Sequence, residues 1–314
     1  MIEFYVDHTL LSSARMCESR FMLDHVSLIR PKGQLPWALD FGTLIHSCME
    51  YYYTHILEDK DLNIGDFLGY ASKLWRDGNY DSHMHTAQYK AVGGFPGFIV
   101  LLTQYYEYYT RSQSNLKPIA LEIPFGRNRE VPILEDPLLY KWAPFRIYLA
   151  GRMDFIFDDG RRLGPLDHKT FSMAGKNPMT TYEVQEGMTG YIYAMNHIYK
   201  KHFQHLMERE TNVLWLNFIL TKSEPDLNKR FQRVPLYKTQ EQLEDFRIRQ
   251  ISTCAKIYQL LFEGRPPDYN GHVCTNYWHS LCHYQPVHRL ASKADQEFVL
   301  KNEFVQVEAW NPEK

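Results

Sequence analysis

The sequence predicts an α/β fold in which a central mixed sheet is flanked by helices, and two observations carry that prediction. The stretch Ile147 to Thr170 contains two strand-like apolar runs joined at Asp158-Asp159-Gly160, and Asp-Gly between such runs is typical of a tight hairpin turn. Segments of helical character lie before and after it, from Asp61 to Asn115 and from Tyr182 to Phe203. We therefore expect the hairpin to form the centre of the sheet.

The amino-acid composition limits the classes of protein to which this chain can belong. The chain has 314 residues, of which 44% are hydrophobic and 23% charged, as in an ordinary globular protein. Its 35 basic and 37 acidic residues give no overall positive field, so a nucleic-acid partner would need a local basic groove or bound metal. The longest apolar run, around Phe95 to Leu102, is far shorter than the ~20 residues of a membrane span. We expect a soluble protein with no membrane partner.

The first part of the chain is expected to be mainly helical. Ser12 or Ser13 is predicted to cap a short helix that runs through Leu23. Gly33 to Pro36 is typical of a loop, and a second helix is predicted to follow Phe41-Gly42-Thr43. A loop at Gly93 to Gly97 is expected to interrupt the helices that continue to Asn115. Tyrosine clusters in these helices are expected to pack in the core rather than to stack on bases.

The remaining elements complete the sheet and close the chain. Ile119 to Phe125 and Val213 to Leu220 are expected to be strands. The polar run Thr221 to Arg233 is predicted to be a solvated loop, with a phosphate-contacting edge as the alternative. Thr239-x-x-Gln242 is a capping box for a long helix to Phe262. No segment is typical of a linker, which predicts one domain over residues 1–314, with a helical part at about 10–115, a core at about 116–222 and a C-terminal helix and cysteine-containing segment at about 223–314.

The charged residues of the hairpin suggest a metal site. Side chains alternate along a strand, so Asp167 and Lys169 share one face while Leu166 and His168 occupy the other. Asp154, on the partner strand, can reach the face of Asp167. Two carboxylates and an ammonium are costly to bury on an apolar hairpin unless they bind a ligand, and a divalent cation would neutralise them. The alternative is an exposed polar face, because Asp-x-Lys also occurs on solvated strands.

One apparent motif in the same strand is excluded. Gly164 to Thr170 superficially matches a phosphate-binding P-loop, which requires Gly-x-x-x-x-Gly-Lys-Ser/Thr so that backbone amides can wrap a phosphate. His168 stands where that motif has its second glycine. The sequence therefore does not support a nucleotide-triphosphatase.

The arrangement GRMD, hairpin, LDHKT resembles the PD-(D/E)XK nuclease superfamily, in particular the RecB-type branch that includes phage exonucleases and CRISPR-adaptation nucleases. The resemblance implies a restriction-endonuclease-like core. It also implies that Asp154 and Asp167 hold one or two Mg²⁺ (or Mn²⁺) ions and that His168 contributes its backbone carbonyl. Lys169 would position or activate the attacking water.

Two further metal ligands follow from the same resemblance. The run Gly42 to His46 (GTLIH) is similar to the family's helix that carries a histidine over the active site, which makes His46 an additional ligand. Glu122 resembles the glutamate that precedes the core hairpin and can add a metal contact. The alternative for Glu122 is a solvent-facing residue on an edge strand.

The family also has a Gln-x-x-x-Tyr motif that lines the substrate groove. Met188 to Tyr191 is similar to that motif, but Gly187 stands where the glutamine belongs. The resemblance therefore implies a substrate contact for Tyr191, and Gln185 is the nearest substitute for the missing glutamine. This departure concerns the substrate contacts rather than the metal site.

Cysteines form a second candidate site. A subset of RecB-type nucleases binds a [4Fe-4S] cluster through one N-terminal and three C-terminal cysteines, and Cys17, Cys274, Cys282 and His288 resemble that set. Here the fourth ligand would be a histidine, and the gap between Cys274 and Cys282 is longer than usual. A Cys₃His zinc site is an alternative, as are unrelated thiols in a reducing cytosol. The other two cysteines, Cys48 and Cys254, are predicted to be core residues.

These features together predict a metal-dependent DNA nuclease, expected to be an exonuclease that hydrolyses phosphodiester bonds at linear ends. Its context would be recombination, repair or phage replication in a bacterial or phage-infected host cytosol. Two alternatives remain at this point. One is a catalytically inactive DNA-binding or assembly protein with a nuclease-like fold. The other is a zinc-stapled interaction protein whose hairpin acids form only a polar surface.

Overall fold

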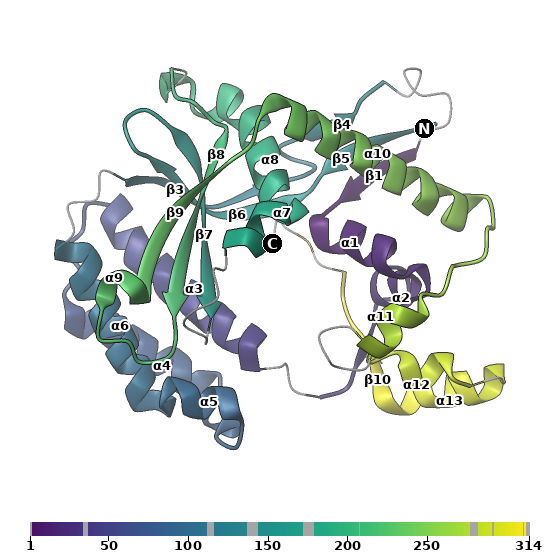
Figure 1. Cartoon of the computed structure of the whole chain (residues 1–314), viewed down its shortest axis with the longest axis horizontal. Helices are drawn as coiled ribbons and strands as arrows, with labels where there is room; N and C mark the ends of the chain where they lie inside the picture. The colour runs from purple at the N-terminus through teal and green to yellow at the C-terminus, as the bar shows by residue number, and fades with distance from the viewer. Residues whose placement is uncertain are drawn as a thin grey trace. The chain divides into compact units, whose positions relative to one another are not determined.

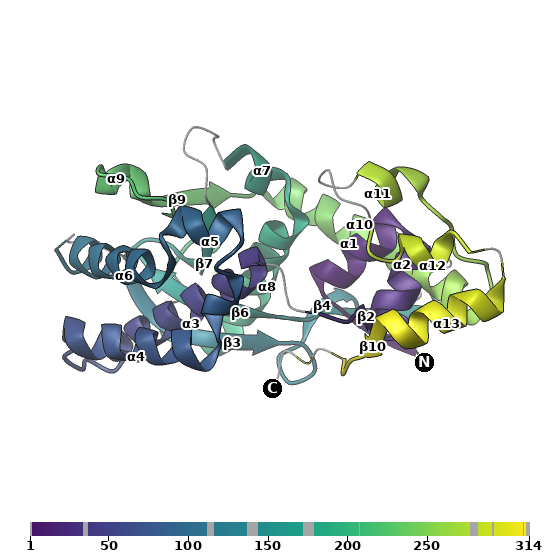
Figure 2. The ribbon, with the colours of Figure 1, turned by 90° about the horizontal axis from the view of Figure 1, so that it is seen from below.

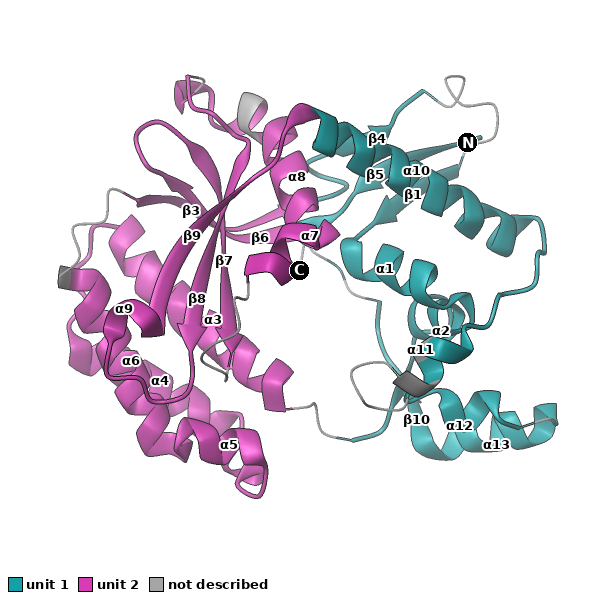
Figure 3. Cartoon of the chain, viewed as in Figure 1, with its two compact units in different colours: residues 1–34, 125–151, 241–314 teal, residues 35–124, 152–240 magenta. Residues whose placement is uncertain are grey.

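The computed structural model describes residues 2–33, 37–111, 116–136, 144–171, 179–206, 208–276, 282–290, 292–309 and 311. It divides into two compact units (Figure 3): unit 1 comprises Met1–Gln34, Phe125–Gly151 and Glu241–Lys314, and unit 2 comprises Leu35–Pro124 and Arg152–Gln240. The predicted α/β fold with a central mixed sheet flanked by helices is confirmed. Within the described ranges, no helix is long and apolar enough to cross a membrane.

The central sheet lies in unit 2 (Figure 1). It has five strands in the order β3-β6-β7-β8-β9. Strands β6 and β7 are antiparallel, β7 and β8 are parallel, and β8 and β9 are antiparallel. Their bounds are β3 Lys117–Phe125, β6 Gly151–Asp158, β7 Leu163–Phe171, β8 Val213–Leu220 and β9 Phe231–Tyr237.

The predicted hairpin is formed by β6 and β7, although Ile147 to Leu149, predicted as part of it, belong to a strand of another sheet, β5 Phe145–Leu149. Its turn is closed by a hydrogen bond from the Asp159 amide to the Arg162 carbonyl at 3.0 Å. Gly160 has φ 90°, a left-handed conformation that glycine adopts without a Cβ clash. The Asp159 carboxylate accepts hydrogen bonds from the Arg161 and Arg162 amides, which fixes the turn. The hairpin thus presents β7 at the centre of the sheet.

Helices of unit 2 lie on both faces of this sheet. Tyr53 of α3 packs against Phe155 and Phe157 on one face, whereas Tyr182 of α7 packs against Phe218 on the other. Helix α8 packs against β7 and β8, and α4 packs against α3 and α6 (Figure 2). The helices are α3 Trp37–Leu57, α4 Ile64–Asp77, α5 Ala87–Val92, α6 Gly94–Arg111, α7 Met179–Val184, α8 Glu186–His202 and α9 Leu227–Arg230.

Two predicted boundaries in unit 2 are wrong. Helix α3 begins at Trp37, before the predicted start after Thr43, because Trp37 and Phe41 already stack in the core. The predicted loop at Gly93 to Gly97 is only a helix junction. Gly93 ends α5 at φ 88°, and α6 starts at Gly94 with Pro96 in its first turn, where a missing amide hydrogen costs nothing.

The core of unit 2 is rich in aromatic side chains. Trp75 is buried and contacts Trp37 and Phe98 at ring-centroid distances of 6.1 and 5.0 Å. Tyr53 and Tyr105 are also buried, and their hydroxyls lie 2.8 Å apart. Their position confirms that tyrosines of these helices pack in the core.

Unit 1 contains two smaller sheets and the remaining helices. One sheet has the order β1-β5-β4, from β1 Ile2–Val6, β5 Phe145–Leu149 and β4 Val131–Leu134. The other pairs β2 Ile29–Pro31 with β10 Phe304–Gln306. The helices are α1 His8–Met16, α2 Glu18–Phe21, α10 Gln240–Phe262, α11 Gly271–Asn276, α12 Gln285–His288 and α13 Lys293–Glu303.

The first helix is capped by a residue other than the predicted serines. Asp7 is the N-cap of α1, and its carboxylate accepts hydrogen bonds from the Thr9 and Leu10 amides at 2.7 and 2.8 Å. Ser12 and Ser13 lie inside the helix. An acidic cap also interacts favourably with the helix dipole. Of the predicted loop at Gly33 to Pro36, residues 34–36 lie outside the described part of the chain.

The polar run Thr221 to Arg233 is a mainly exposed loop only in its first half, from Thr221 to Asp226. Its second half contains α9 and the start of β9, which pairs with β8 along its length. Arg230 is 2% exposed, and its guanidinium donates to the Leu220 carbonyl and to Gln104. For the second half the prediction was wrong, because pairing with β8 and packing under α6 bury side chains that the local sequence alone presents as a charged surface.

Candidate active site

Three of the predicted metal ligands meet in unit 2. His46 of α3, Asp154 of β6 and Asp167 of β7 each offer a ligand atom, and these atoms all lie within 4.8 Å of one another. In the described part of the chain they form the sole group of three or more His, Cys, Asp or Glu residues that meets this distance. Nδ1 of His46 is 2.8 Å from Oδ2 of Asp154.

Strand register explains this meeting. Phe155 of β6 pairs with Leu166 of β7, so the adjacent residues Asp154 and Asp167 point together to the opposite face of the sheet. Lys169, two residues farther along β7, shares that face, and its Nζ lies 2.6 Å from Oδ2 of Asp167. The hairpin therefore presents both carboxylates and the ammonium at one place.

His46 joins the two strands to α3. One ring nitrogen pairs with Asp154, and Nε2 donates to the His168 carbonyl at 2.9 Å, so this carbonyl points into the site. Burial lowers the pKa of His46, but the hydrogen bond and charge of Asp154 outweigh that effect and raise the pKa to about 9. In this state His46 is an imidazolium that uses both N–H donors. Metal coordination by His46 would require it to release a proton.

Burial and neighbouring charges act oppositely on Asp167 and Lys169. Burial raises the pKa of Asp167, and the negative charge of Asp154 raises it further, while Lys169 and His46 oppose the shift. Burial lowers the pKa of Lys169, but Asp167 more than offsets this and holds that pKa above its usual value. A divalent cation would relieve the repulsion between the carboxylates, and two carboxylates with a carbonyl fit the oxygen preference of Mg²⁺.

Glu122 lies on β3 near this group. Burial, followed by the charges of Asp154 and Glu50, raises the pKa of Glu122 to about 7, although Arg152 opposes the shift from 3.4 Å. Its backbone has φ 48°, which a residue other than glycine adopts only at a cost. Glu122 is thus within electrostatic range of Asp154, while its side chain remains 33% exposed.

Tyr182 of α7 is a site neighbour that sequence reasoning missed. Nζ of Lys169 lies 5.8 Å from the centroid of its ring, and burial raises the pKa of Tyr182 while Lys169 lowers it. Tyr191 lies on α8, and Gln185 is exposed between α7 and α8. Their predicted substrate contacts remain predictions. No local pattern marks Tyr182, because its relation to Lys169 arises from the packing of α7 on the sheet.

The predicted cysteine ligands lie in unit 1. Cys17, Cys274 and Cys282 are 3%, 0% and 7% exposed. Burial raises the pKa of Cys274, whose thiol forms hydrogen bonds with Tyr269 and Cys282 and lies within electrostatic range of Cys17. The Cys282 amide donates to the Cys274 carbonyl at 3.0 Å, which holds their backbones together. These sulfur atoms do not all lie within the 4.8 Å that the His46 group satisfies.

His288 borders the same group. Its ring packs edge-on against Tyr269 at a centroid distance of 5.4 Å, and its buried Nδ1 has no hydrogen-bond partner. Burial lowers the pKa of His288, so the ring is neutral at physiological pH. A neutral imidazole with an unpartnered buried nitrogen, packed on the tyrosine that contacts the Cys274 thiol, fits a soft metal ion or cluster.

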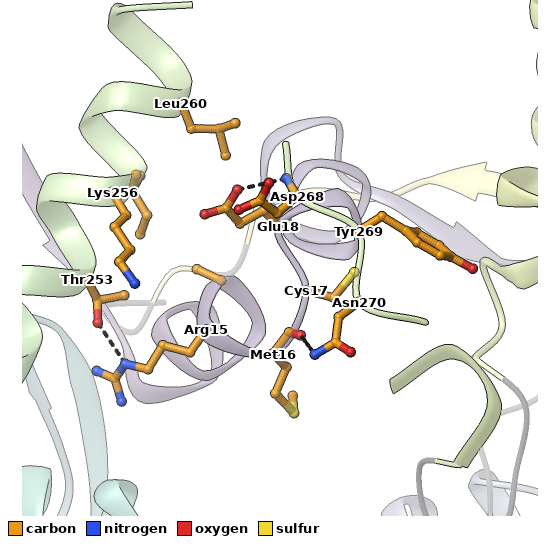
Figure 4. A pocket seen from close by; sticks show the side chains of 12 residues that line it. Arg15, Met16, Cys17, Glu18, Thr253, Lys256, Leu260, Asp268, Tyr269 and Asn270 are labelled. Atoms are coloured by element: carbon orange, nitrogen blue, oxygen red, sulfur yellow. Dashed lines mark hydrogen bonds between the residues drawn. The ribbon is translucent and has the colours of Figure 1, made fainter. Parts of the chain in front are cut away.

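A cavity of about 230 Å³ adjoins this group in unit 1 (Figure 4). Cys17 and Tyr269 belong to its lining. The Asp268 amide donates to Glu18 and the Asn270 side chain donates to the Met16 carbonyl, both at 2.9 Å. These bonds join the segment before α11 to the end of α1 and the start of α2. They thereby bring residues distant in the sequence to the same region as Cys17.

Comparison with known proteins identifies the family. No curated protein matched the chain. A family model described as the PD-(D/E)XK nuclease superfamily matches residues 8–287, which include parts of both units. Members of this superfamily are generally metal-dependent nucleases that act on DNA. This match over most of the sequence agrees with the five-stranded sheet and with the hairpin that carries the acidic pair and the lysine. The chain belongs to the PD-(D/E)XK nuclease superfamily.

Proposed function

We propose that this protein is a RecB-type exonuclease that hydrolyses DNA phosphodiester bonds from linear ends, in recombination, repair or phage replication. One observation supports catalysis above all others: Asp154, Asp167 and Lys169 lie on one face of the hairpin, beside the His168 carbonyl and His46. An ammonium beside a divalent-cation site matches the needs of phosphodiester hydrolysis, in which a water must be activated and negative charge stabilised.

Each residue has a role in this proposal. Asp154, Asp167, the His168 carbonyl and His46 would hold Mg²⁺ or Mn²⁺, with Glu122 as a further contact. The bound ion would lower the pKa of a coordinated water and stabilise negative charge on the phosphate oxygens. Lys169, held as an ammonium by Asp167, orients the nucleophile and offsets developing charge. Tyr191 and Gln185 are the proposed substrate contacts.

The test compares end-labelled linear duplex and single-stranded DNA with a closed circle, in the presence of Mg²⁺ or Mn²⁺. The wild-type protein is expected to degrade only the linear substrates. Lys169→Met is expected to lower the rate by about 10²-fold or more, because it removes a group that acts on the transition state. Lys73→Met, which changes an exposed lysine of α4, is expected to leave the rate unchanged.

Other outcomes decide between the alternatives. Cleavage of the closed circle at the same rate would contradict an exonuclease and indicate an endonuclease. If wild type and Lys169→Met are equally inert but bind DNA, the catalytic proposal fails in favour of a binding protein. Equal activity of wild type and Lys169→Met would show that Lys169 has no catalytic role.

We also propose that Cys17, Cys274, Cys282 and His288 bind a [4Fe-4S] cluster, with Zn²⁺ as the alternative. The contact between the thiols of Cys274 and Cys282 and the unpartnered Nδ1 of His288 support a ligand there. The cluster is placed before zinc because of the resemblance to the iron-sulfur subset, since the contact between the Cys274 and Cys282 thiols suits either ligand. The role would be structural, because the group would join segments distant in the sequence.

Metal analysis tests this second proposal. Protein purified without oxygen is expected to contain iron and acid-labile sulfide, which Cys274→Ala loses. Cys254→Ala is the matched control, because Cys254 is equally buried in α10 but lies apart from this set. Stoichiometric zinc would indicate the alternative ligand, and wild-type protein free of both metals would refute the proposal.

A further inference from the structure

A network of buried polar side chains lies behind the His168 carbonyl. The His168 ring is 1% exposed and points to the face of the sheet opposite Asp167. Its Nδ1 lies 2.7 Å from Nδ2 of Asn217. Because an amide nitrogen can only donate, Nδ1 of His168 accepts this hydrogen bond. The His168 backbone carbonyl thus contacts His46 while its ring contacts Asn217.

Asn217 is fully engaged in this network. It stands opposite His168 in the parallel pairing of β7 and β8, and it is 0% exposed. Its Nδ2 also donates to the Tyr105 hydroxyl at 3.0 Å, and its Oδ1 accepts from the Tyr109 hydroxyl at 2.8 Å. Because each of these bonds is directional, the amide has one satisfied orientation and fixes the His168 ring in turn.

Two more residues hold the tyrosines. The Tyr53 hydroxyl is 2.8 Å from that of Tyr105, and Arg233 donates to Tyr53. The guanidinium carbon of Arg233 also lies 3.8 Å from the centroid of the Tyr109 ring, in a cation–π contact. Arg233 stands opposite Asn217 in the pairing of β8 and β9. The network therefore ties α3 and α6 to three adjacent strands of the sheet.

We infer that Asn217 is a positioning residue for the metal centre. By fixing the His168 ring, it restricts rotation of the His168 backbone and holds the carbonyl toward His46, which contacts it at 2.9 Å. This inference rests on the proposed function, because the carbonyl matters there as a metal ligand. Residues that support a metal ligand typically change metal affinity by about 10- to 100-fold when they are mutated.

A purely structural role for the network makes a different prediction. It would lower the stability of every network variant and leave metal affinity unchanged in the fraction that is folded. If Asn217 positions the carbonyl, its loss instead weakens metal binding in the folded protein, and saturating metal restores the rate. The two roles therefore separate when the metal dissociation constant and the maximal rate are measured independently.

The matched variants are single hydroxyl deletions in α6. Tyr109→Phe removes the bond to Asn217, whereas Tyr106→Phe removes a bond to the Leu62 carbonyl outside the network. We expect Tyr109→Phe and Asn217→Ala to weaken Mn²⁺ binding, by about 3-fold and about 10-fold or more, and to retain most of the rate at saturating Mn²⁺. Tyr106→Phe is expected to bind Mn²⁺ like the wild type. Equal affinities in all four proteins, measured by direct titration, would overturn the inference.

A double-mutant cycle tests the route through the His168 ring. His168→Phe keeps the backbone carbonyl but cannot accept a hydrogen bond from Asn217. If Asn217 acts through that ring, the double variant His168→Phe/Asn217→Ala binds Mn²⁺ about as weakly as either single variant. Additive losses would show that Asn217 acts by another route and would refute the inference.

One measurement on metal-free protein separates this inference from the proposed function. Nitrogen NMR can follow the His46 Nε2 proton, which the bond to the His168 carbonyl protects from exchange with water. We expect faster exchange in Asn217→Ala and wild-type behaviour in Tyr106→Phe. If this pattern holds while wild-type protein binds no Mn²⁺, the positioning stands and the proposed metal chemistry fails. Unchanged exchange in Asn217→Ala refutes the positioning even if the protein is an active nuclease.

Discussion

Asp167→Asn is expected to abolish DNA hydrolysis, by about 10³-fold or more, and to lower the melting temperature. The substitution preserves shape but removes a negative ligand from the proposed metal centre and the partner of Lys169. Stability should fall as well, because the substitution leaves the partly buried Lys169 ammonium without its charged partner. Nuclease assays and thermal unfolding of the same metal-free preparations measure the two effects.

Asp158→Asn provides the matched control on the neighbouring strand. Asp158 forms two hydrogen bonds with Arg209, at 2.8 and 3.2 Å, away from the metal ligands. Its replacement is expected to keep the nuclease rate and lower the melting temperature, because it weakens a charge-assisted pair. A reversed pattern, with activity retained in Asp167→Asn and lost in Asp158→Asn, would place the catalytic centre elsewhere.

Gly164→Ala is expected to destabilise the protein by about 3 kcal/mol or more. A Cβ at Gly164 would lie 2.2 Å from the Val213 carbonyl oxygen and 3.1 Å from the Trp215 ring. The first of these is backbone of the adjacent strand, so β7 and β8 would have to separate at the centre of the sheet. Denaturant unfolding measures the loss, and the nuclease rate should fall as well because β7 carries Asp167 and Lys169.

Gly69→Ala is a control for which we expect the opposite change in stability. Gly69 lies inside α4, and a Cβ there meets nothing within 4 Å. Alanine should therefore stabilise the helix by about 0.5–1 kcal/mol through reduced backbone entropy in the unfolded chain. A Gly164→Ala protein as stable as wild type would show that the two strands can part without cost.

The sequence predicted the hairpin, two of the three other sheet strands, at Ile119–Phe125 and Val213–Leu220, and the face shared by Asp167 and Lys169. These features depend on alternation and turn chemistry within a few residues, which local patterns record. The expectation that His46 approaches the hairpin came from family resemblance, since a contact across more than a hundred residues leaves no periodic trace. Gly164 was considered first as part of a phosphate-binding loop. The structure explains why a glycine stands there, because β8 approaches β7 too closely for a Cβ.

What sequence reasoning missed depends on pairing between distant strands. Arg233 belongs to a charged run in the sequence, and its tyrosine partners lie more than a hundred residues earlier. Asn217 did leave a signal, because it is the one polar residue in the otherwise apolar strand Val213–Leu220. A lone amide in a buried strand must find hydrogen-bond partners, and that requirement predicts a polar network around Asn217 from the residues of this strand alone.

The division of the chain has a consequence for its synthesis. Unit 2 ends at Gln240, whereas unit 1 needs Glu241–Lys314 in addition to its two earlier segments. Because a chain emerges from the ribosome in order, the strands that carry Asp154, Asp167 and Lys169 are available to fold while Cys274 and Cys282 are still untranslated. We therefore expect the nuclease site to take shape on the nascent chain first, and any cluster or ion held by the cysteines to be inserted only after Cys274 and Cys282 have emerged.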